Sequence, residues 1–251
     1  MMRSDAELAA QIEPFDSFWE APDDVESGYS SWARFYRANY LDRLPSDRDA
    51  EIFVVSCGPG YLVQLLADEG YRRVEGIDSF PEKIAFAERR GLPCRVGRAF
   101  AFLGSEERSF DAIFCEQELN HLTKEEMRDF LELCRKRLKI GGRLIVHGLN
   151  GANPITGAEA LAQNYDHYNS FTAYSLEQIL EHCGFRDIEV FPLHLYVFYG
   201  NPANYVAWGA AAALNLMFRA CFLLYGKKNK LWSKKIGATA VNRGERAPRR
   251  S

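Results

Sequence analysis

Two glycines in a short turn are the clearest chemical feature of this sequence. Val54 and Val55 end a run of apolar residues, and Gly58 and Gly60 follow in the turn Ser-Cys-Gly-Pro-Gly. Glycine lets backbone amides approach a ligand closely, and a helix that begins after the turn adds its partial positive charge. Asp78, about twenty residues later, could accept hydrogen bonds from the hydroxyls of a ribose. The spacing therefore predicts a site for a cofactor that contains a nucleoside.

A dinucleotide-binding oxidoreductase fits this turn less well. Its Gly-x-Gly-x-x-Gly pattern requires a third glycine at the position that Val63 occupies. A tight turn with no ligand is the other alternative, because a Gly-x-Gly pair alone is a weak signal. The predicted strand before the turn, the helix after it and Asp78 together favour a nucleoside-containing cofactor over both.

Histidines near strand ends are the candidates for moving a proton, because the pKa of imidazole lies near neutral pH. His121 follows the fourth predicted strand and His167 lies in a later loop, so both are expected at the sheet edge that holds the turn. We predict His167 as the general base and His121 as the second candidate, with Asp166 orienting a ring or binding hydroxyls. A structural hydrogen bond is the alternative role for either histidine.

Residues 164–170 combine amide, hydroxyl, carboxylate and aromatic side chains. These types suit a sugar, which presents hydroxyl edges and apolar ring faces. A loop held together by its own asparagine and aspartate hydrogen bonds is the alternative. The predicted edge offers no Cys-x-x-Cys pair, His-x-x-x-His spacing or clustered carboxylates, so no metal site is predicted.

Alternating strands and helices position these residues. Short apolar runs predict strands over 51–55, 73–77, 94–96, 110–115 and 143–147, and amphipathic or capped segments predict helices over 61–69, 81–90, 124–138 and 175–183. The alternation predicts an α/β fold with a doubly wound, mostly parallel sheet. Two further strands, 188–191 and 195–199, are expected to form an antiparallel hairpin at one edge of the sheet.

The chain is expected to divide into four regions. Residues 1–45 would form an N-terminal helical lid, 46–200 the main domain, 201–241 a C-terminal helical appendage and 242–251 a disordered tail. In the appendage, 205–218 carry no charge and five lysines lie between 227 and 235. This pattern predicts a helix that packs on the domain or lies in the interface of an anionic membrane. Asn215 and Arg219 argue against a helix that spans the bilayer.

Composition limits the class of protein. The 251 residues are 47% hydrophobic and 26% charged, which is typical of a globular chain and not of a disordered one. The net charge of −3 argues against general nucleic-acid binding, although ten Lys or Arg and one acid lie from residue 219 onward. The cysteine pattern and the acidic first 26 residues, which lack the basic and apolar parts of a secretory signal, favour a cytoplasmic protein.

The sequence resembles the class I S-adenosylmethionine-dependent methyltransferases from about residue 36 to residue 199. The resemblance is carried by the glycine turn, by Val-Glu-Gly-Ile-Asp at 74–78, by Phe-Asp-Ala-Ile at 110–113 and by Leu-Lys-Ile-Gly-Gly-Arg-Leu at 138–144. It implies a seven-stranded Rossmann-like sheet and S-adenosylmethionine as cofactor. Segments 120–124, 150–154 and 166–176 are similar to those of methyltransferases found in surface-polysaccharide and other sugar biosynthesis.

The resemblance also implies roles for individual residues. It places Gly58 and Gly60 at the amino-acid end of the cofactor and Asp78 at its ribose. The other residues that it places around the cofactor are Ser79, Phe80, Ala99, Phe100, Glu116 and Gln117. Ser56 in the turn is a further cofactor candidate, and of the N-terminal aromatic residues Tyr36 is expected to face the pocket and Trp32 to pack. The sequence departs from the family where Val54 and Arg98 replace acids and where Ser56 replaces a glycine. The lost acids are lost hydrogen-bond acceptors, which favours a non-catalytic alternative.

The predicted function is O-methylation of a sugar hydroxyl in the assembly of glycans or lipid-linked glycans, with S-adenosylmethionine as donor. The expected partners are a small-molecule or glycan acceptor and, through 205–235, the surface of a membrane; no nucleic acid is expected. Two alternatives stay open. One is a non-catalytic binding module with a methyltransferase-like fold, and the other is a methyltransferase of a small natural product.

Overall fold

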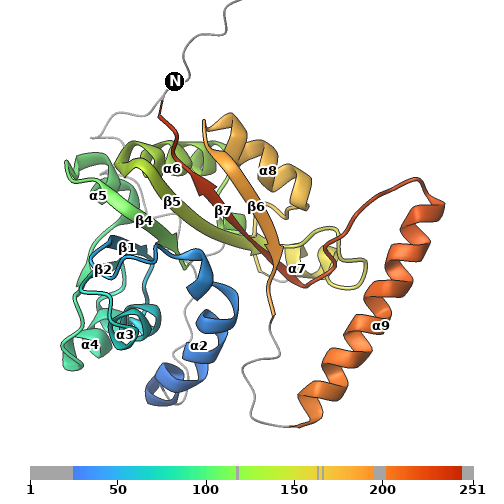
Figure 1. Ribbon diagram of the computed structural model, residues 1–251, viewed down its shortest axis with the longest axis horizontal. Helices are drawn as coiled ribbons and strands as arrows, with labels where there is room; N and C mark the ends of the chain where they lie inside the picture. The colour runs from blue at the N-terminus through green and yellow to red at the C-terminus, as the bar shows by residue number, and fades with distance from the viewer. Residues whose placement is uncertain (1–24, 117–118, 163, 166, 195–201, 245–251) are drawn as a thin grey trace, which may run out of the picture.

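The structure is a computed structural model that describes residues 25–116, 119–162, 164–165, 167–194 and 202–244. Its centre is a seven-stranded sheet (Figure 1). The strands are β1 (Glu51–Val55), β2 (Arg73–Asp78), β3 (Cys94–Val96), β4 (Phe110–Cys115), β5 (Leu138–Leu149), β6 (Arg186–Pro192) and β7 (Lys235–Val241). Their order is β3-β2-β1-β4-β5-β7-β6. Only β7 runs antiparallel to its neighbours, so the predicted mostly parallel, seven-stranded α/β fold is confirmed.

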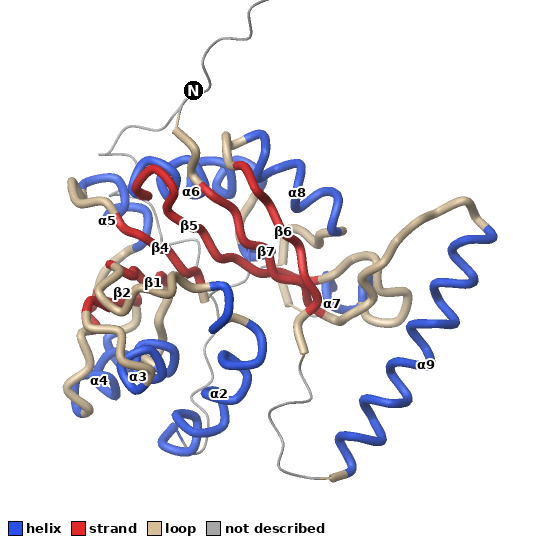
Figure 2. Tube along the Cα trace, viewed as in Figure 1, coloured by secondary structure: helices blue, strands red, loops and turns tan. Residues whose placement is uncertain are grey.

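Helices cover both faces of this sheet (Figure 2). They are α2 (Val25–Asn39), α3 (Tyr61–Asp68), α4 (Pro81–Arg89), α5 (Ala99–Ser105), α6 (Lys124–Arg137), α7 (Gly157–Ala162), α8 (Ala173–His182) and α9 (Ala203–Leu224), with short 3-10 helices at Leu41–Arg43 and Leu119–His121. Residues of α5, α6 and α8 share one buried cluster, and residues of α2, α3 and α4 share the other. The expected N-terminal and C-terminal helices are therefore both present.

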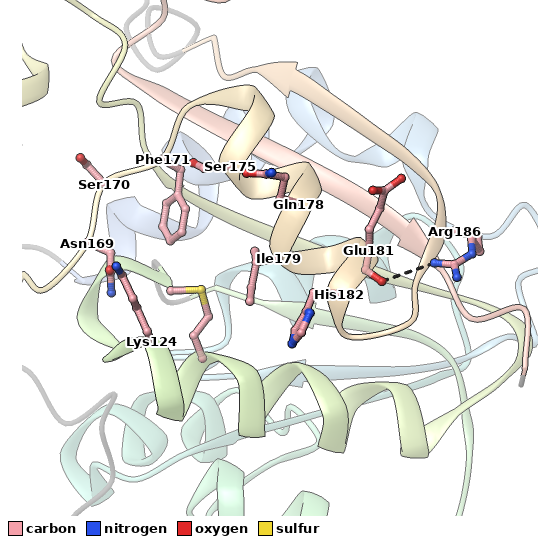
Figure 3. Close-up of a pocket in the computed structure, with 11 residues that line it drawn as sticks. Lys124, Asn169, Ser170, Phe171, Ser175, Gln178, Ile179, Glu181, His182 and Arg186 are labelled. Carbon is pink, nitrogen blue, oxygen red and sulfur yellow. Dashed lines mark hydrogen bonds between the residues drawn. The ribbon is translucent and has the colours of Figure 1, made fainter. Parts of the chain in front are cut away.

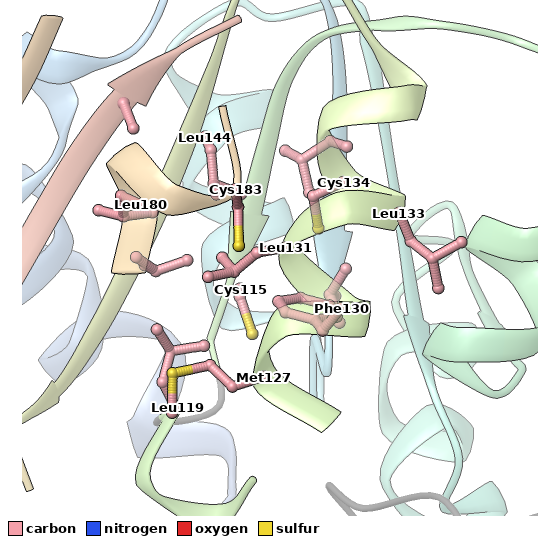
Figure 4. Packing of buried hydrophobic residues seen from close by; sticks show 14 of the residues in the cluster. Cys115, Leu119, Met127, Phe130, Leu131, Leu133, Cys134, Leu144, Leu180 and Cys183 are labelled. Carbon is pink, nitrogen blue, oxygen red and sulfur yellow. The ribbon is translucent and has the colours of Figure 1, made fainter. Parts of the chain in front are cut away.

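The buried strands show why the sheet needs helices on both sides. In β1, Phe53 and Val55 belong to the cluster under α5, α6 and α8, whereas Ile52 and Val54 belong to the cluster under α2, α3 and α4. Successive side chains of a strand point to opposite faces, so an unbroken apolar run is stable only when both faces are covered. Figure 4 shows the first cluster around α6.

The edge of the sheet differs from the predicted hairpin. The antiparallel partner of β6 is β7, and the expected strand at 195–199 lies outside the described residues. β7 comes from the region expected to be a helical appendage, and its Ile236, Ala238 and Ala240 are buried in the sheet core. The sequence did not predict this strand because glycine and alanine have a weak preference for strands and because lysines precede it. Helix α9 is therefore an insertion between the last two strands.

Candidate active site

The glycine turn between β1 and α3 adopts a left-handed backbone at three positions. Ser56, Gly58 and Gly60 have φ values of 54°, 54° and 84°. Ser56 thus takes a conformation that favours glycine, which is where the methyltransferase pattern has one. A Cβ at Gly60 would lie 2.9 Å from Leu92, whereas a Cβ at Gly58 would meet nothing within 4 Å. Gly60 is therefore required for close packing, and Gly58 leaves room for a ligand.

Asp78 joins the end of β2 to this turn. One carboxylate oxygen accepts a hydrogen bond from the Gly58 amide at 2.9 Å, and the other accepts one from the Phe80 amide at 3.0 Å. The Lys83 ammonium lies 3.9 Å from the second oxygen. Each carboxylate oxygen has two acceptor positions, so these bonds leave acceptor capacity for the hydroxyls of a ribose. The turn and the carboxylate that the sequence pairs are in direct contact.

Helix α2 packs directly against the turn. The Tyr29 hydroxyl donates a hydrogen bond of 2.6 Å to the Pro59 carbonyl, and the Tyr61 hydroxyl donates one of 3.0 Å to the Val25 carbonyl. A Cβ at Gly28 would lie 2.3 Å from the Tyr61 ring, so the helix backbone approaches that ring as closely as glycine allows. Helix α2 is thus fixed against the glycine turn; residues 1–24 of the predicted lid lie outside the described residues.

Glu116 and Tyr36 meet across the space beneath α2. The Tyr36 hydroxyl donates a hydrogen bond of 2.5 Å to Glu116 Oε2, while Glu116 Oε1 is buried and has no hydrogen-bond partner among the described residues. Burial raises the pKa of the Glu116 carboxyl well above its ordinary value, and burial likewise raises the pKa of Tyr36. A buried oxygen without a partner costs free energy. A ligand that donates a hydrogen bond or brings positive charge would remove that cost.

These residues border a cavity of about 1050 Å³. Ser56, Gly58 and Glu116 line it beside Trp32, Tyr36 and Tyr61, and α9 and the segment before β7 line it from the other side. This volume matches the upper range of small-molecule sites. The aromatic faces and the Glu116 carboxylate suit a cation such as a sulfonium, and the glycine turn and Asp78 suit an adenosine. The residues present therefore fit S-adenosylmethionine.

The candidate bases are divided between the cavity and its surroundings. His121 lines the cavity and is 7% exposed, and its ring centroid lies 4.6 Å from that of His167. His167 is half-buried and lies 3.2 Å from the Asn164 amide, but it is not among the lining residues. His147 also lines the cavity, 3.4 Å from the Tyr40 hydroxyl. Asp166 lies outside the described residues.

The remaining residues that were predicted to bind the cofactor differ in how accessible they are to a ligand. Ala99 and Phe100 begin α5 with side chains in the core, and Phe100 packs against Phe130 with ring centroids 5.7 Å apart. Only their backbone could therefore meet an adenine. Ser79 is half-buried directly after β2. Gln117 lies outside the described residues.

A second cavity, of about 970 Å³, lies between α6 and α8 (Figure 3). Lys124, His182 and Arg186 line it, together with Asn169 and Ser170 from the loop predicted to suit a sugar. None of its lining residues belongs to the glycine turn or to Glu116. This cavity is therefore separate from the candidate active site.

Lys83 is the site residue that the sequence analysis missed. It lines the main cavity and lies in the first turn of α4, with its ammonium 4.4 Å from the centre of the Phe80 ring. Its position in the sequence could have identified it. Lys83 lies in the helix that follows a parallel strand, and such a helix begins at the same sheet edge as the glycine turn. The side chains of α9 on the opposite wall were also missed, because the sequence suggested membrane contact or packing for that helix.

Comparison with known proteins agrees with this geometry. Residues 52–142 match the model of the methyltransferase domain. A ubiquinone biosynthesis O-methyltransferase from Xylella fastidiosa strain M23 is 32% identical over an alignment of 120 residues that covers 45% of this chain and 48% of that protein. A protein of the same name from Saccharophagus degradans is 26% identical over an alignment of 151 residues that covers 54% of this chain and 62% of that protein. The chain thus spans about half the length of the first of these relatives.

Solved structures show the same fold at low identity. A SAM-dependent methyltransferase from Archaeoglobus fulgidus has a TM-score of 0.62 and 17% identity, and covers 85% of this chain and 94% of its own. Phosphoethanolamine N-methyltransferase 2 from Haemonchus contortus, in complex with S-adenosyl-L-methionine, has a TM-score of 0.54 and 17% identity, and covers 96% of this chain and 58% of its own.

Residues 52–142 therefore match a methyltransferase domain, and the sheet order and the fold are those of S-adenosylmethionine-dependent methyltransferases. S-adenosylmethionine is the cofactor of these methyltransferases. The names of the sequence relatives refer to ubiquinone biosynthesis, and none refers to polysaccharides, so the predicted sugar subgroup stays a prediction.

Proposed function

We propose that this chain transfers a methyl group from S-adenosylmethionine to a hydroxyl oxygen of a small acceptor bound in the main cavity. The observation that carries the proposal is the buried Glu116 Oε1 beside the glycine turn, for which the described part of the chain supplies no hydrogen-bond partner. A carboxylate at this place can stabilise the positive charge of a bound donor. A buried carboxylate with a purely structural role would normally have hydrogen-bond partners for both oxygens. O-methyl transfer is also the activity in the names of the sequence relatives.

The residues around the turn hold the donor. Gly58 and Gly60 lie at its amino-acid end, where the missing side chain of Gly58 leaves room beside the turn, and Asp78 accepts hydrogen bonds from its ribose. When bound, S-adenosylmethionine supplies an electrophilic methyl group on a positively charged sulfonium. Tyr36 and Glu116 offer that charge an aromatic face and a carboxylate. Helix α2 covers the turn and excludes water from the reacting atoms.

His121 is the general base in this proposal. The sequence favoured His167, but His121 lines the cavity, whereas His167 packs its ring against that of His121. The imidazole of His121 takes the proton of the acceptor hydroxyl while the oxygen–methyl bond forms and the methyl–sulfur bond breaks, which leaves S-adenosylhomocysteine. His167 acts through His121 as a positioning residue.

Two acceptor classes fit the site. A phenol with an apolar body suits the aromatic walls from Trp32, Phe35 and Phe218 and corresponds to the names of the sequence relatives. A sugar hydroxyl corresponds to the predicted sugar loop, in which Tyr165 and Tyr168 are exposed. The phenol is the acceptor that we propose, because its apolar body matches the main cavity.

The test is methyl transfer from labelled S-adenosylmethionine to a panel of alkylated or prenylated phenols, sugar nucleotides and lipid-linked sugars. We expect transfer to the phenols. The His121→Asn variant should lower kcat at least 100-fold and leave the affinity for S-adenosylhomocysteine unchanged. Methyl transfer to the sugars and not to the phenols would show that the acceptor is a sugar hydroxyl. Tight S-adenosylhomocysteine binding with no transfer to any acceptor would favour the non-catalytic binding module.

A further inference from the structure

Helix α9 is the most exposed apolar element of the described chain. None of its 22 residues is buried, and in Figure 1 it extends beside the domain instead of covering the sheet. Its mean hydropathy and length would suffice to cross a membrane by composition alone. Soluble helices with this composition are normally covered, so α9 requires an explanation.

The two sides of α9 differ. A half-buried stripe recurs every three or four residues and faces the domain; its members are Asn204, Ala207, Ala211, Asn215, Phe218 and Phe222. The opposite side is apolar and exposed. There Tyr205 and Val206 are 80% and 74% exposed, and Leu216, Leu223 and Leu224 are 69%, 57% and 87% exposed. A continuous apolar surface therefore points away from the protein.

Charge follows directly after this surface. Arg219 is the only charged residue of α9, and Lys227, Lys228, Lys230 and Lys234 follow its last turn. The sequence has no acid between Glu189 and Glu245. An apolar helix followed by lysines matches an anionic lipid surface, because acyl chains accept the apolar side chains and headgroups attract the ammonium groups.

The sheet topology excludes a spanning role. β6 precedes α9 and β7 follows it, and these two strands pair in one sheet, so they lie on the same side of any membrane. A single crossing by α9 would place them on opposite sides. The connections on either side of α9, 193–202 and 225–234, are too short for a second spanning helix, which needs about 20 residues, and non-helical chain does not cross lipid.

We propose that α9 lies in the plane of an anionic membrane interface and docks this domain on it. Its apolar side enters the boundary between headgroups and acyl chains, and the following lysines contact lipid phosphates. A contact between α9 and the α9 of a second copy would bring the lysines of both copies together, so charge complementarity favours the lipid surface over that contact.

The end of α9 is anchored to the domain. Trp232 is 4% exposed, and its ring centroid lies 4.4 Å from that of Phe222 and 6.0 Å from that of Phe218. Asn150 donates hydrogen bonds to the carbonyls of Leu231 and Ser233, and Asn153 donates one to the carbonyl of Trp232. These bonds hold the segment that connects α9 to β7, so a docked α9 would fix the orientation of the domain.

The same helix forms a wall of the main cavity. Trp208, Ala211, Asn215 and Phe218 line it opposite the glycine turn. Docking would therefore place the cavity beside the lipid, and an amphiphilic acceptor could enter from the membrane. This consequence rests on the proposed function, so the docking test uses neither donor nor acceptor and gives a result even if methyl transfer fails.

Flotation of the full chain with lipid vesicles tests the docking. We expect the protein to float with phosphatidylcholine vesicles that contain one-third phosphatidylglycerol, and at least tenfold less binding for the double variant Leu216→Glu, Leu223→Glu. Both side chains are exposed, so the fold should survive, as an unchanged melting temperature would show. The control is Ile140→Glu, which alters an isoleucine that is 80% exposed in β5. It should bind as the wild type does.

A second set of variants separates the two contributions. Replacing Lys227 and Lys228, which do not line the main cavity, with glutamine should lower the affinity for the anionic vesicles by about fivefold per lysine and weaken the effect of salt on binding. Wild-type protein that stays unbound, or a Leu216→Glu, Leu223→Glu variant that floats like the wild type, would overturn the proposal. A lipid-free dimer that the same variant dissociates, without flotation, would assign the surface to a second copy instead.

Discussion

Helices α2 and α9 form opposite walls of one cavity, yet they are held in different ways. α2 is fixed by Gly28 against the Tyr61 ring and by the Tyr29 hydrogen bond to the Pro59 carbonyl. α9 has no buried residue, and the described contacts hold it mainly through Trp232 near its last turn. The α2 wall, next to the glycine turn, is therefore fully packed against the domain. The α9 wall carries an apolar surface on its outer side that no described part of the protein covers.

The comparison predicts that changes in α2 affect folding and donor binding, and that matched changes in α9 affect neither. Gly28→Val should have the largest effect, since a Cβ there would lie 2.3 Å from the Tyr61 ring. Overpacking of this kind lowers the free energy of unfolding by about 3 kcal/mol, and displaced α2 should also weaken S-adenosylhomocysteine binding. Urea unfolding measures the first effect and calorimetric titration the second.

The matched control is Gly209→Val in α9, where a Cβ would meet nothing within 4 Å. We expect its unfolding midpoint and ligand affinity to equal those of the wild type. Equal destabilisation by the two substitutions would contradict the difference between the walls.

The Asp78→Ala substitution should have the next largest effect. It removes the acceptor of the Gly58 and Phe80 amides and the proposed acceptor for a ribose. Loss of such bonds costs about 2 kcal/mol, so titration calorimetry should show about 30-fold weaker S-adenosylhomocysteine binding. The control Asp68→Ala removes an exposed carboxylate of α3 that pairs with Gln64, and it should leave the affinity unchanged. Equal affinity in both variants would remove Asp78 from the site.

Glu116 predicts a pH dependence of stability. Burial raises its folded-state pKa above the ordinary 4.5, so the native state holds the proton at pH values where the unfolded chain has lost it. The stabilisation is complete below pH 4.5 and declines as pH rises through the folded pKa, by about 1 kcal/mol per pH unit. Urea unfolding between pH 4.5 and 7 should show this decline in the wild type.

The Glu116→Gln variant provides the comparison for that series, because an amide does not titrate in this range. Its free energy of unfolding should lack this decline, so the free energy of unfolding of the wild type should fall relative to that of the variant as pH rises. Parallel curves would show that Glu116 ionises in the folded protein as it does in water.

Tyr29→Phe should have the smallest effect of the series. It removes the hydrogen bond to the Pro59 carbonyl, which contributes about 1 kcal/mol. Tyr205→Phe on α9, where the hydroxyl belongs to a side chain that is 80% exposed, should change the melting temperature by less than the error of measurement. A larger fall in melting temperature for Tyr205→Phe than for Tyr29→Phe would contradict the conclusion that α2 is the more firmly packed of the two helices.

The local parts of the fold were predictable from sequence. The turn at Gly58 and Gly60 and the strand end at Asp78 depend on neighbours in the chain, and the structure brings them into contact. Strand β7 was missed because its partners in β5 and β6 are far away in sequence, and because Gly237, Ala238 and Ala240 have weak strand preference. Long-range pairing overrides such local preferences.

The candidate site follows the same division. Tyr36 and Glu116 were predicted separately, but their hydrogen bond joins residues 80 positions apart, and no local pattern reports such a contact. The choice between His121 and His167 also depended on tertiary structure, since both were expected at the same sheet edge and, of the two, His121 lines the cavity. Apolar composition marked α9, but its position opposite the glycine turn required the sheet.

A crystal structure of the full chain with S-adenosylhomocysteine tests the central claim most directly. The ligand should occupy the cavity between α2 and α9, with its ribose at the Asp78 carboxylate and its amino-acid end beside Gly58. A saturated crystal in which the ligand binds elsewhere, or in which side chains fill the space beside Glu116, would contradict the assignment of this site.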